Sequence, residues 1–285
     1  MVLCTSLCKG RNLSVIGAGR IGSAIIRALR EYCGDNVKII ATGRRNETLE
    51  NAKKLDVIAT RDNRKAVKEA DIIVLSVKPQ HFPEVIRQTG KDVWSGKLVV
   101  SVMAGVKVKT LAAVMPGAEI YRAMTNINVS VGKASTAIAT PEDNSVNRSI
   151  VEELFKCMGE VYWVPEEYLD VWTSLVGSGP AFIAEIVDAL ILGAMASGMP
   201  RDIAYKSILD VLEGTAILLR NVDKHPATIR DEVITPAGTT IRGVMVMESE
   251  GVKAALMKTI EATYKRSIEI GMEIDQYVKK ELNIS

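Results

Sequence analysis

The pattern of apolar and polar positions divides the chain into two halves. From residue 13 to residue 164, short apolar runs alternate with segments whose apolar residues recur at helical spacing. Runs such as 71–77 (DIIVLSV) and 98–102 (LVVSV) lack polar alternation, which is typical of strands covered on both faces of a parallel sheet. The pattern therefore predicts one doubly wound α/β domain over residues 1–164.

After residue 165 the strand signals disappear, and helices are predicted over 167–197, 201–221, 226–233, 239–249 and 252–281. The first of these is apolar nearly all round, so it is buried either in a large core or against another subunit. A C-terminal domain of this size is too small to enclose so long a helix. We therefore predict an all-helical dimerisation and substrate-binding domain over residues 165–285.

Three glycines follow the first apolar run in G-x-G-x-x-G spacing, between a predicted strand and a predicted helix. Gly17 permits the tight turn, Gly19 lets the backbone approach a pyrophosphate, and Gly22 lets helix and strand pack closely. The N-terminus of the helix attracts phosphate. A glycine-rich turn that binds nothing can have the same spacing, but the strand–turn–helix context favours a Rossmann dinucleotide site.

The end of the second predicted strand indicates which dinucleotide is bound. An NAD site usually has an acidic residue at this point, whereas this chain has Thr42, Gly43, Arg44 and Arg45. A hydroxyl and two guanidiniums suit a 2′-phosphate, unless the arginines only form a solvated turn. The sequence thus predicts NADP as cofactor, with NADPH preferred and NADH possible.

A second anion site is predicted near the end of the chain. Thr235 and Pro236 suit a helix cap, and Gly238, Thr239 and Thr240 then begin a helix without an acidic residue. Backbone N–H groups and hydroxyls that converge in this way suit a carboxylate. A capped helix turn without a ligand explains the same residues equally well.

Composition excludes several classes of partner. The chain has 36 Lys and Arg against 34 Asp and Glu, so nothing indicates binding to nucleic acid or to an anionic membrane. No secretory signal and no uninterrupted apolar run of membrane-spanning length is present. The four cysteines lack C-x-x-C spacing and only two histidines occur, which predicts no metal site and reduced thiols in a cytoplasmic protein.

Six motifs occur along the chain: IGAGRIG at 16–22, SVKPQ at 76–80, SVMAGV at 101–106, RAMTN at 122–126, GSGPAF at 177–182 and ITPAGTTIRGV at 234–244. In these motifs the chain resembles the pyrroline-5-carboxylate reductase family over nearly everything after residue 12. The resemblance implies a Rossmann domain, a helical dimerisation domain with active sites at the dimer interface, and dimers that assemble into rings. It also implies reduction of the cyclic imine 1-pyrroline-5-carboxylate to L-proline.

The resemblance also implies site residues. Its cofactor contacts fall on Gly17, Ala18, Gly19, Arg20, Ile21, Gly22, Thr42, Gly43, Arg44, Arg45, Asn63, Val77, Lys78, Pro79, Met103, Ala104 and Gly105. Its substrate contacts fall on Gly238, Thr239 and Thr240, with Glu166 as a neighbour across the interface and Asp223 at an acidic position of the family. The chain departs from the family at Asn126-Ile127-Asn128, and at Ala237, where a glycine is usual.

The chain lacks a Tyr-x-x-x-Lys pair and has no lysine in GSGPAF or directly after it. The first absence argues against a short-chain dehydrogenase, and the second argues against a hydroxyacid dehydrogenase that uses such a lysine as general acid. We therefore expect catalysis by positioning, with Thr240 as the catalytic residue that hydrogen-bonds the ring nitrogen. A non-catalytic NADP(H)-binding redox sensor would have a damaged substrate helix, yet the residues from Gly238 to Thr240 are intact.

Overall fold

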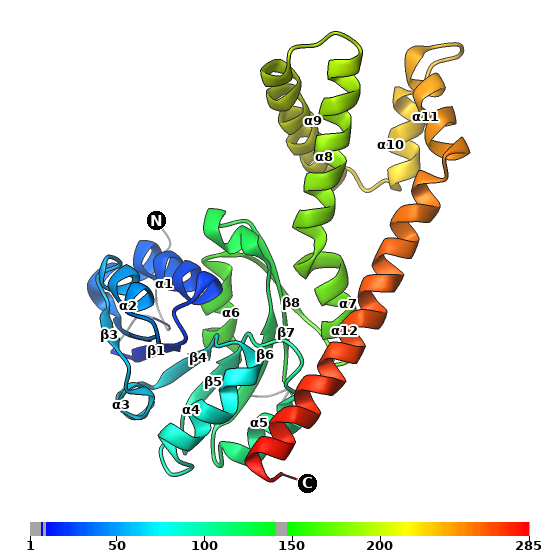
Figure 1. Ribbon diagram of the computed structural model, residues 1–285. Helices are drawn as coiled ribbons and strands as arrows, with labels where there is room; N and C mark the ends of the chain where they lie inside the picture. Colours follow the sequence, from blue (N-terminus) through cyan, green and yellow to red (C-terminus); the bar gives the residue numbers. More distant parts are fainter. Residues whose placement is uncertain (1–6, 8–9, 141–146, 285) are drawn as a thin grey trace. The chain divides into compact units, whose positions relative to one another are not determined.

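The computed structural model describes residues 7, 10–140 and 147–284 (Figure 1). It divides into two compact units, which we name the sheet unit (Met1–Ser178 with Thr263–Ser285) and the helical unit (Gly179–Ala262). The first boundary between these units lies at residue 178, because Leu169 packs against β7 of the sheet, and the predicted domain boundary at residue 164 stays a prediction. The C-terminal segment joins the sheet unit because Val278 belongs to its core.

A single mostly parallel sheet forms the centre of the sheet unit. Eight strands of the described residues lie in the order β3-β2-β1-β4-β5-β6-β7-β8, and every neighbouring pair is parallel except β6 and β7. The strands are β1 (Asn12–Ile16), β2 (Lys38–Thr42), β3 (Ile58–Thr60), β4 (Ile72–Leu75), β5 (Leu98–Ser101), β6 (Glu119–Met124), β7 (Ala134–Ala139) and β8 (Gly159–Trp163). The order reverses between β1 and β4, which is where such folds bind ligands.

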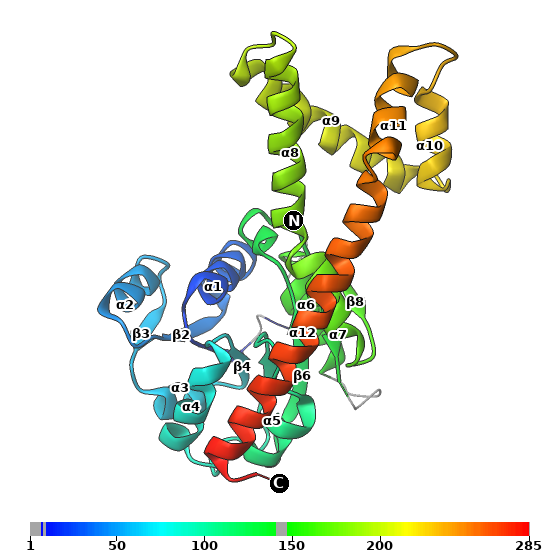
Figure 2. The same cartoon turned by 45° about the vertical axis from the view of Figure 1, so that its right-hand side comes forward.

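Helices cover both faces of this sheet, so the predicted Rossmann architecture is confirmed (Figures 1 and 2). One face packs against α1 (Arg20–Cys33), α2 (Asn46–Lys53) and α6 (Arg148–Lys156). The other packs against α3 (Asn63–Glu69), α4 (Phe82–Thr89), α5 (Val108–Val114) and the C-terminal part of α12 (Val252–Leu282). Short turns of 3-10 helix lie at Gly34–Asn36, Pro79–His81 and Ile127–Val131.

The helical unit contains α8 (Gly179–Ala196), α9 (Arg201–Asn221), α10 (Pro226–Val233), α11 (Thr239–Ser249) and the beginning of α12. These bounds agree with the predicted helices except in the first segment. There the chain forms α7 (Tyr168–Trp172), a π-helical turn (Thr173–Gly177) and only then α8. The Ser178 N–H donates to the Thr173 carbonyl, a hydrogen bond one residue longer than in an α-helix.

Much of the apolar surface of α8 is uncovered in the single chain. Ile183, Leu190 and Leu192 are 50%, 49% and 50% exposed. Among the described residues, one helical segment, Tyr168–Ala196, is long and apolar enough to cross a membrane by length and composition. A helix that packs against another subunit has the same composition. The segment also contains most of the long apolar helix that we predicted to form a subunit interface.

The cysteines differ from the prediction in one respect. Cys33 is disulfide-bonded, so the expectation of reduced thiols is wrong for this residue. Cys157 is free, and burial raises the pKa of its thiol to about 12. Within the described part of the chain, no group of three or more His, Cys, Asp or Glu side chains could hold a metal ion.

Candidate active site

Each glycine of the G-x-G-x-x-G motif has the local geometry that the sequence predicts. Gly17 has φ of +98°, and a Cβ added to it would lie 2.7 Å from Val77 Cγ1. A Cβ on Gly22 would lie 2.4 Å from the Gly17 carbonyl oxygen, so helix and strand approach too closely for a side chain. A Cβ on Gly19 would meet nothing within 4 Å. The backbone at Gly19 is therefore open to an approaching ligand.

The start of α1 suits a pyrophosphate. Gly19 is its N-cap residue, without a side-chain cap, and the first turn contains no acidic residue. The Ala18 N–H donates to the Thr42 carbonyl at 2.7 Å, and the Ser76 hydroxyl donates to the Gly17 carbonyl at 2.7 Å. The glycine turn is thus held between β2 and β4, with the positive end of the α1 dipole exposed.

Thr42 shapes this turn from inside. Only 2% of the residue is exposed, and its hydroxyl accepts a hydrogen bond from the Gly17 N–H at 3.2 Å. The side chain therefore supports the glycine turn, and a contact of Thr42 with the cofactor stays a prediction. The exposed groups at the end of β2 are Arg44 and Arg45.

Helix α4 contributes contacts that the sequence analysis missed. Glu84 Oε2 lies 3.7 Å from Arg44 Nη1, and the Asn63 side-chain amide donates to Gln88 Oε1 at 2.6 Å. Glu84 and Gln88 are one helical turn apart, and this spacing was the available signal that they share a face of α4. Their proximity to Arg44 and Asn63 could not be predicted in this way, because it depends on the strand order. Arg61, at the end of β3, similarly donates to the Asn46 side chain.

The turns after β4 and β5 complete the predicted cofactor side. Val77, Lys78 and Pro79 follow β4, and Met103, Ala104 and Gly105 follow β5. A cavity of about 120 Å³ adjoins the second turn and is lined by residues of the sheet unit that include Met103, Ala104, Gly105, Arg122, Asp170 and Ser267. Of the predicted cofactor residues, Thr42 ends β2 and Asn63 begins α3, and the others follow the carboxyl ends of β1, β2, β4 and β5 or begin α1.

Glu166 has a structural partner in its own chain. Its Oε1 accepts hydrogen bonds from the Val108 N–H at 2.8 Å and from Arg122 Nη1 at 2.6 Å. The carboxylate therefore caps α5 and neutralises a guanidinium whose side chain is only 10% exposed. These contacts give Glu166 a structural role within its own chain, and its predicted place as a substrate neighbour across the interface stays a prediction.

The second predicted anion site lies in the helical unit. Gly238 is the N-cap residue of α11, whose first turn has no acidic residue. A Cβ on Gly238 would lie 2.2 Å from Thr235 Oγ1, so this turn requires glycine. Ala237, where the family usually has glycine, has φ of +58°, a left-handed conformation that glycine adopts more readily. Thr239 is exposed and Thr240 is half-buried.

Asp223 is exposed in the loop between α9 and α10. Close by in sequence, His225 is the N-cap residue of α10, and its Nδ1 accepts a hydrogen bond from the Ala227 N–H at 3.1 Å. The described residues show no hydrogen bond or ion pair between Asp223 and the start of α11. The structure therefore provides no contact that would support the predicted substrate role of Asp223.

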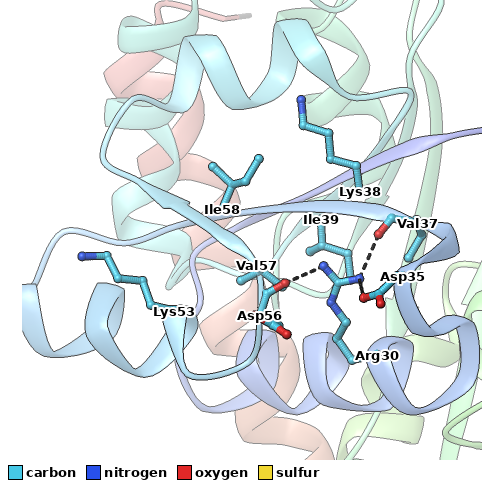
Figure 3. Close-up of a pocket in the computed structure, with 9 residues that line it drawn as sticks. All are labelled: Arg30, Asp35, Val37, Lys38, Ile39, Lys53, Asp56, Val57 and Ile58. Carbon is cyan, nitrogen blue, oxygen red and sulfur yellow. Dashed lines mark hydrogen bonds and ion pairs between the residues drawn. The ribbon is translucent and has the colours of Figure 1, made fainter.

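A larger cavity lies elsewhere in the sheet unit. It has a volume of about 420 Å³ and is lined by residues at the beginning of β2 and β3, with Arg30 at its floor (Figure 3). Arg30 donates to the carbonyls of Val37 and Asp56 there. Because this cavity is at the amino ends of the strands, it is on the opposite edge of the sheet from the glycine turn and is not part of the candidate site.

Comparison with known proteins supports a family assignment. The family model described as pyrroline-5-carboxylate reductase dimerisation matches residues 166–270, and that described as NADP oxidoreductase, coenzyme F420-dependent, matches residues 12–105. Pyrroline-5-carboxylate reductase of Synechocystis sp. is 34% identical over 91% of this chain and 98% of its own length. The Methanosarcina acetivorans enzyme of the same name is 34% identical over 92% and 99%.

The chain belongs to the pyrroline-5-carboxylate reductase family. A solved structure of the reductase from Coxiella burnetii is similar in fold, with a TM-score of 0.82 and 29% identity over 91% of this chain and 98% of that one. The family resemblance inferred from the six motifs is therefore confirmed. The matches of the two family models also agree with the expected order of an N-terminal dinucleotide-binding part and a C-terminal helical dimerisation part.

Proposed function

We propose that this protein reduces 1-pyrroline-5-carboxylate to L-proline, with NADPH as the preferred reductant and NADH as a weaker one. The observation that supports this most strongly is the similarity to curated pyrroline-5-carboxylate reductases over more than nine-tenths of the chain. The open backbone at Gly19 and the acid-free start of α11 also support the proposal, because each would suit an anionic group of the cofactor or substrate.

The cofactor would be held by the residues at the carboxyl ends of the strands. The glycine turn and the start of α1 would bind the pyrophosphate through backbone N–H groups, and Arg44 and Arg45 would bind the 2′-phosphate. The turn from Met103 to Gly105 would support the nicotinamide. When bound, the reduced nicotinamide supplies a hydride to the imine carbon.

The start of α11 would orient the substrate. N–H groups near Gly238 and the Thr239 hydroxyl would bind the substrate carboxylate, and the Thr240 hydroxyl would hydrogen-bond the ring nitrogen. A protonated imine is already a good electrophile, so positioning can supply most of the catalysis, on the order of 7–11 kcal/mol. Asp223 would lie near the substrate, whereas Glu166 would act indirectly by fixing α5 and Arg122.

The assembly would be a homodimer formed through the apolar surface of α8, with dimers able to assemble into a larger ring. The exposed Ile183, Leu190 and Leu192 support this interface, as does the match of the dimerisation model to residues 166–270. We further propose a cytoplasmic enzyme without nucleic-acid or membrane partners.

The test is the decay of NADPH absorbance with pyrroline-5-carboxylate, repeated with NADH. In the Thr240→Ala variant we expect turnover to fall about a hundredfold, a typical loss for one transition-state hydrogen bond. Thr240→Ser keeps the hydroxyl and should retain most activity. NADPH affinity, measured by fluorescence titration, should stay unchanged in both variants.

Other outcomes favour other functions. Tight NADPH binding without decay in the wild-type protein would indicate a redox-sensing module. NADP reduction with a 2-hydroxy or 3-hydroxy acid, and none of the imine reaction, would indicate a hydroxyacid oxidoreductase. Full turnover in Thr240→Ala would remove Thr240 from the mechanism.

A further inference from the structure

Helix α4 brings an acidic side chain to the end of β2, where the sequence itself has none. Glu84 Oε2 lies 3.7 Å from Arg44 Nη1, and both side chains are partly exposed, 49% for Glu84 and 59% for Arg44. In NAD-binding folds an acidic residue at the end of β2 accepts a hydrogen bond from the ribose 2′-hydroxyl. In this chain the acidic residue beside Arg44 is Glu84, which belongs to helix α4 and not to the end of β2.

A chain of hydrogen bonds holds this carboxylate in place. Glu84 Oε1 accepts from the Gln88 side-chain amide at 3.2 Å, and Gln88 Oε1 accepts from the Asn63 amide at 2.6 Å. Glu84 and Gln88 occupy adjacent turns on one face of α4. The network therefore connects Arg44, after β2, with Asn63, at the start of α3, through α4.

Arg44 and Glu84 form an ion pair, and two further basic residues occur close by in the sequence. Lys78 and His81 precede α4, and the charges of Arg44, Glu84 and Lys78 all act on His81. Burial lowers the pKa of His81, and the charges of Arg44 and Lys78 lower it further, against the opposing effect of Glu84. The lowered pKa favours the neutral form of His81, which competes less with Arg44 for the carboxylate than a charged imidazole would.

We propose that Glu84 is a specificity-determining residue, which competes with the 2′-phosphate of NADPH for Arg44 and accepts a hydrogen bond from the 2′-hydroxyl of NADH. Gln88 is the positioning residue that orients Glu84 and Asn63. This inference rests on the proposed use of NADP(H). It would allow a chain with two arginines at the end of β2 to bind NADH as well as NADPH.

The test measures binding rather than turnover. The full-length protein and its Glu84→Gln variant are titrated with NADPH, NADH, adenosine 2′,5′-bisphosphate and AMP. Removing the charge should raise the NADPH-to-NADH affinity ratio about three- to tenfold, the effect of one charge near the 2′-phosphate at a partly exposed site. The ratio of the affinity for adenosine 2′,5′-bisphosphate to the affinity for AMP should rise by the same factor. Both increases should shrink at high salt, because the charges are exposed.

Two further variants make the result specific. Glu47→Gln removes an exposed carboxylate in the first turn of α2. The described residues show no ion pair between Glu47 and Arg44, so this variant should leave both ratios within about twofold, because exposed charges without a direct contact are screened. Gln88→Leu releases both Asn63 and Glu84. It should weaken NADPH and NADH and change their affinity ratio less than Glu84→Gln does, because the carboxylate is kept. An unchanged ratio in Glu84→Gln, or an equal change in Glu47→Gln, overturns the role of Glu84. Absence of any dinucleotide binding by the wild-type protein instead overturns the proposed function.

Discussion

Arg30 joins three segments of the sheet unit through their backbone carbonyls. Its Nη1 donates to Gly34 O at 2.8 Å and to Val37 O at 3.0 Å, and its Nη2 donates to Asp56 O at 2.6 Å (Figure 3). These carbonyls belong to the end of α1, the start of β2 and the loop before β3. Asp35 Oδ1 lies 3.9 Å from Arg30 Nη1, but the Asp35 side chain is fully exposed. This ion pair therefore adds little to the stability of the protein.

We expect Arg30→Ala to lower the free energy of unfolding by about 2–3 kcal/mol, because charge-assisted hydrogen bonds are lost and carbonyls are left unpaired. Arg30→Lys cannot form the same fork and should recover only part of this loss. Urea unfolding at fixed protein concentration measures both values. Arg27→Ala, at an exposed position on the same helix, should change stability by less than about 0.5 kcal/mol. Equal losses at both positions would contradict the role of Arg30.

At this scale, motif residues could be placed from sequence but their individual contacts could not. The three glycines could be assigned because each role depends on local backbone geometry. Thr42 and Glu166 were predicted as ligand contacts, and no sequence pattern indicated that they also bond to Gly17 and Arg122 within the protein. Such contacts join residues far apart in the chain, so they depend on the strand order and not on spacing.

Helix α12 meets the turn after β5 through two glycines. Gly105 has φ of +80°, and a Cβ added there would lie 3.0 Å from Gly271 Cα. A Cβ added to Gly271 would come no closer than 3.7 Å to any neighbour, an ordinary van der Waals contact. The contact therefore requires glycine on the turn but not on the helix.

This asymmetry predicts opposite results for two alanine substitutions. Gly105→Ala combines strained backbone with a steric clash and should cost about 2–3 kcal/mol of stability. Gly271→Ala should be neutral or stabilise the protein by up to about 1 kcal/mol, the difference in helix propensity. Thermal unfolding of the two variants under the same conditions provides the comparison. A Gly271→Ala variant as unstable as Gly105→Ala would show that the turn and the helix are packed more tightly than described.

Element boundaries were predicted well because they follow local patterns. Helices α9, α10 and α11 begin and end at the predicted residues, where Pro and Gly mark their ends. The long helix predicted over 167–197 was wrong in detail, since a π-helical turn interrupts it before Gly179. Apolar periodicity does not register such a turn, because the side chains on both sides of it remain apolar.

A buried carboxylate fixes α12 to the rest of the sheet unit. Asp275 is 5% exposed and accepts hydrogen bonds from Thr110 Oγ1 at 2.6 Å and the Lys107 N–H at 3.2 Å. Its other oxygen lies 3.0 Å from Lys279 Nζ. Burial alone would raise the pKa of Asp275, but the hydrogen bonds of Thr110, Lys279 and Lys107 outweigh it and lower the pKa below 3.8.

This shift makes the stability of the sheet unit depend on pH in a defined direction. Because the folded state favours the ionised form, the unfolded state binds more protons, and the contribution of Asp275 is complete only above its unfolded pKa. Asp275→Asn should cost about 2–3 kcal/mol at pH 7. The difference from wild type should decline as the pH falls through 3.8 and below, toward the folded pKa. Unfolding curves between pH 7 and pH 3 test this.

Glu273→Gln is the matched control on the same helix, because that carboxylate is 66% exposed and pairs only at the surface with Arg266. It should change stability by less than about 0.5 kcal/mol at either pH. A pH dependence in the Asp275→Asn difference that runs in the other direction would contradict the assigned ionisation.

The last feature belongs to the whole molecule, because the apolar face of α8 is not covered within the single chain. Leu190 is 49% exposed on a helix whose surface is largely apolar. In a symmetric dimer each substitution occurs twice, and Leu190→Glu would both lose apolar burial and bury a charge. We expect the dimer to weaken by about a thousandfold or more, so that light scattering at micromolar concentration detects monomer, with loss of imine reduction.

Lys206→Glu, an exposed polar position on α9, should stay dimeric and active. If the wild-type protein is itself an active monomer, or if Leu190→Glu assembles normally, the proposed interface through α8 is wrong.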